Sequence, residues 1–258
     1  MTNEQYIEAI EKRRSRREYK NRPLDPEIMG ILKEMVAAVN ETAGLDLMFI
    51  EDATPVFKIF KGKFSMIAVC GPNTQKARED CGFYGESIVL HCVYHGLGTC
   101  WVSGTYNENK TYQMINLPND KRLYGVITIG YAKDSYGLIE STMYKATHKK
   151  NKPYQKMLSV CDQKLPEEYI YAMKLVEAAP SAVNRRPVNF KYENGKFSAS
   201  VDEPYSDKSI DFGIAKLHFM LGCRAKGING HWTEDNFFEE TEAQRIKFKP
   251  KETENKDE

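Results

Sequence analysis

The 258-residue chain lacks an excess of charge of either sign. Its 37 lysine and arginine residues stand against 36 aspartate and glutamate residues, which gives a formal net charge of +1. Without such an excess there is no overall field that would draw the protein onto nucleic acid or an anionic membrane. Any basic binding site in this protein must therefore be local.

The sequence also has no long apolar run. No stretch approaches the roughly 20 consecutive apolar residues that a membrane-spanning helix needs. The N-terminal segment "MTNEQYIEAIEKRR" lacks the apolar core of a secretory signal peptide. We therefore expect a cytoplasmic protein that has no contact with membranes.

Metal and disulfide signatures are missing as well. The six cysteines form no C-x-x-C pair and mostly lie inside apolar runs, which is typical of reduced thiols in a protein core. His91 and His95 have the i, i+4 spacing of two metal ligands, but no third ligand is evident nearby, so we expect no metal site. The glycine fingerprint G-x-G-x-x-G after a strand is also absent, so a nicotinamide cofactor would have no domain of its own.

Helix and strand signals alternate along the chain. Capping residues and apolar spacing predict helices at about 4–15, 25–39, 74–95, 165–179 and 211–227. Apolar runs and turn residues predict strands at 46–51, 64–70, 122–132, 188–192 and 196–201. This alternation indicates an α/β or α+β protein.

The second half of the chain repeats features of the first half. "GKFS" at 62–65 recurs at 195–198. Five further identities follow at one constant offset: Asp80, Gly82, Cys92, Gly96 and Trp101 match Asp211, Gly213, Cys223, Gly227 and Trp232. Chance would give about one identity in such a window. The alternative is a pair of unrelated helices that both end in glycine and tryptophan, and we favour a tandem duplication.

The duplication divides the chain into two repeats and a tail. We assign 1–150 to the first repeat, 151–246 to a shorter second repeat, and 247–258 to a charged, flexible tail. Because fusion of a homodimer is the natural origin of such a chain, we expect the halves to pack as a pseudo-dimer about an approximate twofold axis. Binding sites in such proteins tend to lie between the halves.

One stretch without a counterpart in the other half is "EKRRSRREY" (11–19). It gathers Arg13, Arg14, Arg16 and Arg17 around Ser15 at a predicted helix end. Guanidinium groups match phosphate oxygens in geometry and charge, so this stretch is a candidate phosphate cradle. A solvated helix end and a nucleic-acid patch are the alternatives.

The second such stretch is "AAPSAVNRRPVNF" (178–190). Its prolines and polar residues predict a rigid polar loop between a helix and a strand, which brings a hydroxyl, an amide and Arg185 or Arg186 to one place. The alternative is an ordinary helix stop. Since each stretch occurs in one half, the two together could form one composite site.

At this point a family resemblance is visible. "RRSRREY", "APSAVNRRPVNF" and "GLGTCWVSG" resemble the three signature stretches of the nitroreductase-like flavoproteins, whose usual forms are R-R-S-x-R, P-S-x-x-N-x-x-P and G-L-G-x-x-W-x-x-G. That family has an α+β fold and forms homodimers that hold flavin mononucleotide (FMN) at the subunit interface. The resemblance implies a tandem branch, in which one chain folds as a monomeric pseudo-dimer with one flavin site.

The resemblance also implies which residues contact the flavin from the first half. Arg13, Arg14 and Ser15 would contact the phosphate and ribityl chain, and Arg17 would lie toward the ribityl chain and the pyrimidine edge. The run "KNKP" resembles the family's late basic pair that closes on the phosphate, which implies Lys150 and Lys152.

From the other half, the flavin would be met by the loop residues Pro180, Ser181, Ala182 and Asn184. The backbone N–H groups of Ser103 and Gly104 would face N5 and O4 of the ring. The loop departs from the family pattern at Val188, where an aromatic residue is usual, and at Arg185 and Arg186, where uncharged residues are common. These departures bear on the shape of the pocket and its substrate preference.

The resemblance implies an FMN-dependent oxidoreductase in which NAD(P)H reduces the flavin, and the flavin then reduces a nitroaromatic, quinone or similar planar acceptor. The reactive atom is N5 of the flavin, so we expect no catalytic side chain. The alternatives are a flavin-binding or scavenging protein with little turnover and a degenerate copy without cofactor. A nucleic-acid-binding protein is disfavoured by the near-zero net charge.

Overall fold

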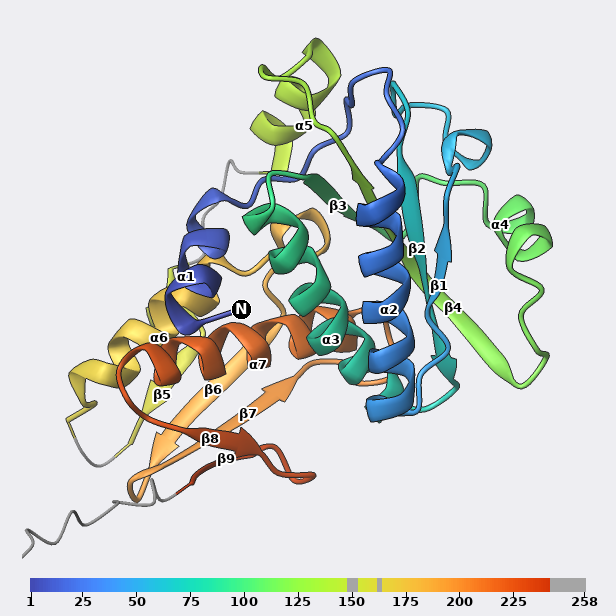
Figure 1. The fold of residues 1–258 in the computed structure, drawn as a ribbon. Coiled ribbons are helices and arrows are strands. Elements are labelled where there is room, and N and C mark those ends of the chain that lie inside the picture. Colours follow the sequence, from blue (N-terminus) through green and yellow to red (C-terminus); the bar gives the residue numbers. More distant parts are fainter. Residues whose placement is uncertain (148–152, 162–163, 242–258) are drawn as a thin grey trace, which may run out of the picture.

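The computed structural model describes residues 1–147, 153–161 and 164–241 (Figure 1). The predicted tail at 247–258 and two predicted cofactor contacts, Lys150 and Lys152, lie outside these ranges. The α-helices are α1 (Asn3–Lys12), α2 (Pro26–Ala43), α3 (Gln75–Tyr94), α4 (Glu108–Ile115), α5 (Leu138–Thr147), α6 (Glu167–Ala178) and α7 (Lys208–Ala225). The strands are β1 (Met48–Ile50), β2 (Ser65–Pro72), β3 (Gly98–Val102), β4 (Lys121–Gly130), β5 (Leu158–Val160), β6 (Val188–Glu193), β7 (Lys196–Val201), β8 (Gly230–Trp232) and β9 (Phe237–Glu240).

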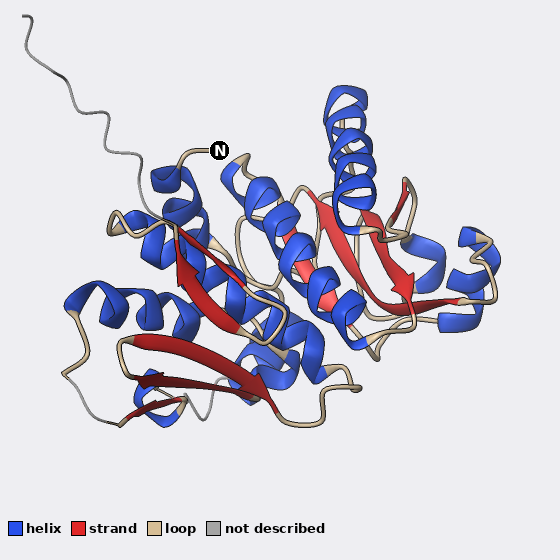
Figure 2. Ribbon diagram, turned by 90° about the horizontal axis from the view of Figure 1, so that it is seen from below, coloured by secondary structure: helices blue, strands red, loops and turns tan. Residues whose placement is uncertain are grey.

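The strands form two sheets with the same topology. The first sheet has the order β1-β2-β4-β3, and every neighbouring pair in it is antiparallel. The second sheet has the order β5-β6-β7-β9-β8. If the edge strand β5 is set aside, the second order repeats the first, strand for strand. In Figure 2 the two sheets lie on opposite sides of a layer of helices.

The contact between the central helices α3 and α7 has the symmetry of a dimer interface. A Cβ atom on Gly82 would lie 2.1 Å from the carbonyl oxygen of Ile210, and one on Gly213 would lie 1.8 Å from the carbonyl oxygen of Glu79. The duplication makes Gly82 equivalent to Gly213, and Glu79 equivalent to Ile210. Each helix therefore offers the same patch to the other, as the subunits of a twofold dimer do.

Matching glycines also end both central helices. Gly96 follows α3 with a φ of 78°, and Gly227 follows α7 with a φ of 81°. This left-handed conformation is readily adopted by glycine, which has no Cβ atom. The tandem pseudo-dimer predicted from the repeated residues is thus visible in topology, in packing and in backbone conformation.

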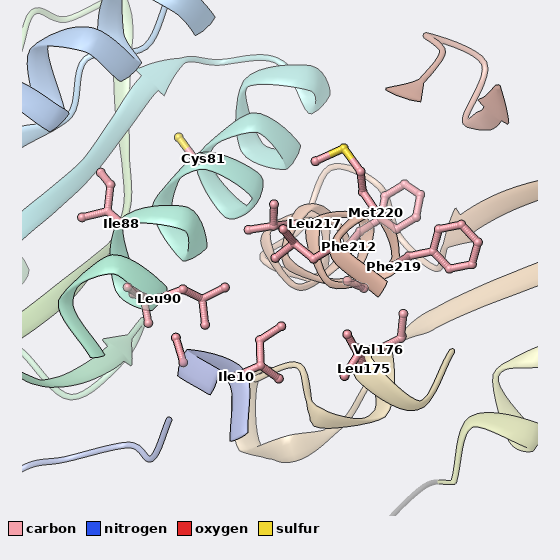
Figure 3. Close-up of a cluster of buried hydrophobic side chains, with 14 of the residues drawn as sticks. Ile10, Cys81, Ile88, Leu90, Leu175, Val176, Phe212, Leu217, Phe219 and Met220 are labelled. Carbon is pink, nitrogen blue, oxygen red and sulfur yellow. The ribbon is translucent and has the colours of Figure 1, made fainter. Parts of the chain in front are cut away.

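One apolar core joins the halves. Figure 3 shows Ile88 of α3 and Leu217 of α7 in a single cluster, with Ile10 of α1 and Val176 of α6 beside them. A second cluster lies on the other face of the first sheet. Alternate residues of β2 enter the two clusters, so the strand is buried on both faces. This burial explains why its sequence is an unbroken apolar run.

The structure corrects some predicted boundaries. Helix α1 ends at Lys12, before the predicted end at 15, because Arg13 takes an extended conformation with ψ of 128°. Helix α2 continues to Ala43, beyond the predicted end at 39. Six elements were not predicted from the sequence: the helices α4 and α5, and the short strands β3, β5, β8 and β9. In the described part of the chain, every helix is too short or too polar to cross a membrane.

Candidate functional site

Two adjoining cavities, which we call the two lobes of the site, open between the halves of the chain. The larger lobe has a volume of about 540 Å³ and the smaller lobe about 340 Å³. Both lobes are lined by Arg13, Ser15 and Arg17 from the first half, and by Ala178 and Arg186 from the second half. These shared residues form a common wall, so the two lobes adjoin each other.

The larger lobe is basic. Arg14 and Lys174 line it in addition to the shared arginines, and the acidic side chains in its lining are Glu11 and Glu177. Cationic side chains therefore outnumber carboxylates in this lobe. Such a surface favours an anionic ligand with several acceptor oxygens.

The basic segment reaches the cavity because it runs beside β3 after α1 ends. Ser15 forms a β-bridge with Thr99, and the backbone N–H of Arg16 donates to the Thr99 carbonyl oxygen at 2.8 Å. This pairing places the arginines next to the strand that leads to Ser103 and Gly104. The predicted phosphate stretch and the predicted "GLGTCWVSG" stretch are thereby brought together.

Arg16 does not line either lobe. Its guanidinium binds the carboxylate of Glu140 at 3.3 Å and the carbonyl oxygen of Lys133 at 2.7 Å. Glu140 is buried, which by itself would raise its pKa, but N–H donors from the arginine segment lower the pKa below its usual range. The Arg16 side chain therefore fixes the segment to the region of α5.

The smaller lobe is mainly apolar. Its walls include the rings of Trp101 and Tyr124 and the side chains of Ile210 and Ile214. Polar groups enter from two places, at Ser103 and Gly104 after β3, and in the loop 179–187. An apolar slot with a few polar groups suits a flat aromatic ligand that has polar edges.

The loop 179–187 has a strained backbone. Val183, Asn184 and Arg186 have φ values of 47°, 57° and 46°. This left-handed conformation is rare for a β-branched residue and costs on the order of 1 to 3 kcal/mol. Such strain persists when the surrounding structure over-determines it, and here the hydroxyl of Ser181 accepts the N–H of Arg186 at 2.9 Å.

Asp211 of α7 anchors the same loop through two hydrogen bonds. Its carboxylate accepts the N–H of Ala182 at 3.0 Å and the Nε–H of Arg185 at 2.9 Å. Burial raises the pKa of Asp211 to about 6, although both of these donors act to lower it. Asp211 also lines the apolar lobe.

The predicted contacts within the described ranges all line the cavity. They are Arg13, Arg14, Ser15, Arg17, Ser103, Gly104, Pro180, Ser181, Ala182 and Asn184. Four further lining residues were not predicted from the sequence, and Asp211 was given no role there; the four are Lys174, Tyr124, Ile210 and Ile214. Residues four apart lie on the same face of a helix. Ile210 and Ile214 on α7, and Lys174 and Ala178 on α6, are such pairs, and this spacing is the signal that could have pointed to them.

Comparison with known proteins decides the family. The model of the family described as "Putative TM nitroreductase" matches residues 5–223. The chain belongs to this nitroreductase family. No curated protein matches the chain.

Several solved structures are similar to this nitroreductase-family chain. A protein from Thermotoga maritima, described as a "putative nitroreductase", is 22% identical, with 90% of this chain and 91% of that chain covered and a TM-score of 0.60. A nitroreductase family protein from Clostridium difficile is 21% identical over 50% of this chain and 85% of its own, with a TM-score of 0.41. An "FMN-dependent Nitroreductase" from Clostridium difficile is 16% identical over 52% of this chain and 93% of its own, with a TM-score of 0.41. The predicted family and α+β nitroreductase fold are confirmed.

In this nitroreductase-family protein, the site that the pseudo-twofold axis relates to the cavity has different side chains from the cavity itself. Trp101 packs against Gly85, where an added Cβ atom would lie 2.6 Å from the ring. The residue equivalent to Gly85 in the second half is Lys216, whose Nζ binds the carboxylate of Glu79 at 2.8 Å. Glu79 is in turn equivalent to Ile210 of the apolar lobe. A largely buried ion pair thus occupies the position where the other side has an apolar wall.

Proposed function

We propose that this nitroreductase-family protein binds one FMN between its halves and uses NAD(P)H to reduce a nitroaromatic, quinone or similar planar acceptor. The observation that carries this proposal is the two-lobed cavity, whose basic and apolar lobes both take residues from both halves. A flavin nucleotide has the same division, with a phosphate at one end and a flat ring at the other. The residues present therefore fit the cofactor that the family resemblance implies.

The basic lobe suits the phosphate end. Arg13, Arg14 and Arg17 from the first half face the same lobe as Lys174 and Arg186 from the second half. Charge-assisted hydrogen bonds from these groups would hold a phosphate dianion and fix its orientation. Because the donors come from both halves, the phosphate would bridge the pseudo-dimer.

The apolar lobe suits the ring. When bound, FMN supplies a ring that takes two electrons from a reduced nicotinamide and passes them to the acceptor. Trp101, Tyr124 and Ile214 would exclude water from the ring, and the backbone of Ser103 and Gly104 would offer N–H donors to its polar edge. Arg17 lines both lobes, so it would bring positive charge next to the ring.

A double substitution tests the phosphate site. Arg13→Ala with Arg17→Ala should weaken FMN binding at least tenfold, because charge-assisted hydrogen bonds contribute about 1.5 to 3 kcal/mol each. Quenching of flavin fluorescence during titration measures the dissociation constant. The matched control is Arg22→Ala with Lys33→Ala, which removes the same charge from exposed positions outside the cavity. Unchanged affinity in the first variant would refute the assignment.

A flavin-binding or scavenging protein with little turnover would use the same cavity. It differs from an oxidoreductase in one observable, which is the reduction of the bound flavin by NAD(P)H. A cytoplasmic location and a monomeric state stay predictions from the sequence.

A further inference from the structure

A polar cluster centred on two fully buried residues, Glu86 and His218, lies beside the cavity, where α3 meets α7. The carboxylate of Glu86 accepts the indole Nε1–H of Trp101 at 2.7 Å. Its other oxygen lies 3.2 Å from Nε2 of His218 and 3.7 Å from Nε of Arg13. Glu86 and His218 are both 0% exposed. One carboxylate therefore touches two residues that line the cavity and one histidine from the other half.

His218 connects this carboxylate to the start of the cavity loop. Its Nδ1 lies 3.0 Å from the carbonyl oxygen of Leu175, near the end of α6. In a continuing α-helix the N–H of Ala179 would donate to the Leu175 carbonyl. Here it donates to the carbonyl oxygen of Val176 at 3.1 Å instead, so the Leu175 carbonyl is available to His218. A carbonyl oxygen only accepts, so Nδ1 carries the hydrogen. The histidine thus completes the C-terminal end of α6, where the loop 179–187 begins.

The proton count of the pair follows from this contact. Since Nδ1 is already protonated, Nε2 can hydrogen-bond to Glu86 only if one proton lies between the two residues. Glu86 and His218 together then carry no net charge. The positive charge of Arg13 beside them is not cancelled by the pair, so it stays available to a ligand in the cavity.

Arg13 needs this neighbour for its orientation. Its Nε is buried and makes no hydrogen bond to any described residue, and its side chain is 14% exposed. The nearby Glu86 oxygen attracts the Nε edge of the guanidinium into the wall, while the residue lines both lobes. Without a carboxylate facing it, this orientation of the guanidinium would be unfavourable, because burial removes the water that otherwise solvates the charged group.

We infer that Glu86 is a positioning residue, which holds Arg13 in the orientation that binds the flavin phosphate. This inference rests on the proposed function, since it assigns Glu86 a role toward the same ligand. Glu86 itself lines neither lobe, so it acts through Arg13 and Trp101. His218 keeps the Glu86 carboxylate paired and ties it to the second half.

Glu86→Gln separates positioning from charge. The amide can still accept from Trp101, and its NH2 group can donate to a neutral His218, so the net charge of the pair stays zero. The same NH2 group would then face the Nε–H of Arg13, and two donors repel each other. We expect Arg13 to leave its position although the local charge is unchanged.

The readout is the preference of the protein for FMN over riboflavin, which lacks the phosphate. Fluorescence titration of both ligands gives the dissociation constant of riboflavin divided by that of FMN, and this ratio is large when the protein prefers FMN. Glu86→Gln should reduce this ratio about tenfold, the size of one charge-assisted hydrogen bond, while riboflavin affinity changes less than about twofold. In an Arg13→Ala background, Glu86→Gln should change the ratio no further, because the residue that it positions is gone.

Glu79→Gln is the matched control. Glu79 lies on the same helix and is also buried, but its partner is Lys216 on the pseudo-symmetric side. This variant should lower stability and leave the ligand ratio unchanged. If Glu86→Gln weakened FMN and riboflavin equally, or changed neither, the positioning role would be overturned.

Two further measurements keep the outcomes distinct. If Glu86→Gln failed to fold, Glu86→Gln with His218→Gln would be measured in the same way, since that pair leaves no unpaired charge in the core. If the unaltered protein bound neither ligand, the proposed function would fail, and the inference with it. If it bound FMN with a preference that Glu86→Gln left intact, the inference alone would fail.

Discussion

Asp211 illustrates how one residue type serves two purposes in a duplicated chain. In the second half it is 6% exposed and holds the strained loop through Ala182 and Arg185. Its counterpart Asp80 binds Lys76 near the surface, with side-chain exposures of 19% and 68%. The identity that marks the duplication in the sequence thus corresponds to a surface ion pair in one half and to a loop anchor beside the cavity in the other.

The raised pKa of Asp211 predicts a pH dependence of stability. Its folded-state pKa is about 6 against an ordinary value of 3.8, so between these pH values the folded chain binds the proton that the unfolded chain has lost. The contribution of Asp211 to the free energy of unfolding is therefore highest below pH 3.8 and falls as pH rises to about 6, by about 2 to 3 kcal/mol.

Asp211→Asn removes this titration. Urea denaturation of both proteins at several pH values between 4 and 7 gives the free energy of unfolding. The unaltered protein should lose stability relative to the variant as pH rises across this range. Parallel pH profiles would contradict the assignment of a raised pKa to Asp211.

At the scale of elements, the close contact of α3 with α7 is what joins the two halves. The helices approach each other at Gly82 and Gly213, where the facing atoms are backbone carbonyl oxygens. A carbonyl in a helix cannot move aside as a flexible side chain can. Each of these glycines is therefore required by the packing of the pseudo-dimer.

Alanine at either glycine should be destabilising. Gly82→Ala and Gly213→Ala should each lower the free energy of unfolding by about 3 kcal/mol, because the added methyl group forces the helices apart. Gly30→Ala is the control, since nothing lies within 4 Å of a Cβ atom at this position of α2. It should raise stability by about 0.5 to 1 kcal/mol. Thermal or urea unfolding measures all three, and tolerance of Gly82→Ala would contradict the packing.

Local signals predicted most of the long elements and the short strand β1, and they failed for α4, α5 and the other short strands. The capping residues of α2 and the apolar run of β2 are sufficient evidence by themselves. Strands β8 and β9 have three and four residues, and they form because pairing within the second sheet holds them. Such elements depend on tertiary contacts, which a local pattern does not contain.

The same division holds for the candidate site. Arg13 and Ser181 lie in stretches that occur in one half only and that resemble family motifs, and both residues line the cavity. Lys174 and Ile214 lie on helices with no motif, and only the packing of the halves brings them to the same cavity. Glu86 is harder still to find, since a glutamate in an apolar helix gives no sign of which arginine it faces.

At the scale of the whole molecule, the two halves have equivalent sheets and equivalent central helices, but the two sites related by the pseudo-twofold axis differ. One side has Ile210 and the loop 179–187 around a cavity, with Gly85 packed against Trp101, and the other side has Lys216 paired with Glu79. An ion pair that is largely buried is costly to separate, so a flat apolar ligand would not displace it. We therefore predict one flavin for each chain, where a dimer of two equal halves would hold two.

The most direct test is the visible absorbance spectrum of the purified protein after incubation with FMN and desalting, recorded before and after anaerobic addition of NADPH or NADH. We predict about one retained flavin for each chain, and bleaching of its absorbance by the nicotinamide. Retained flavin that is not bleached would identify a flavin-binding protein without the proposed turnover. No retained flavin, or two flavins for each chain, would contradict the single composite site between the halves.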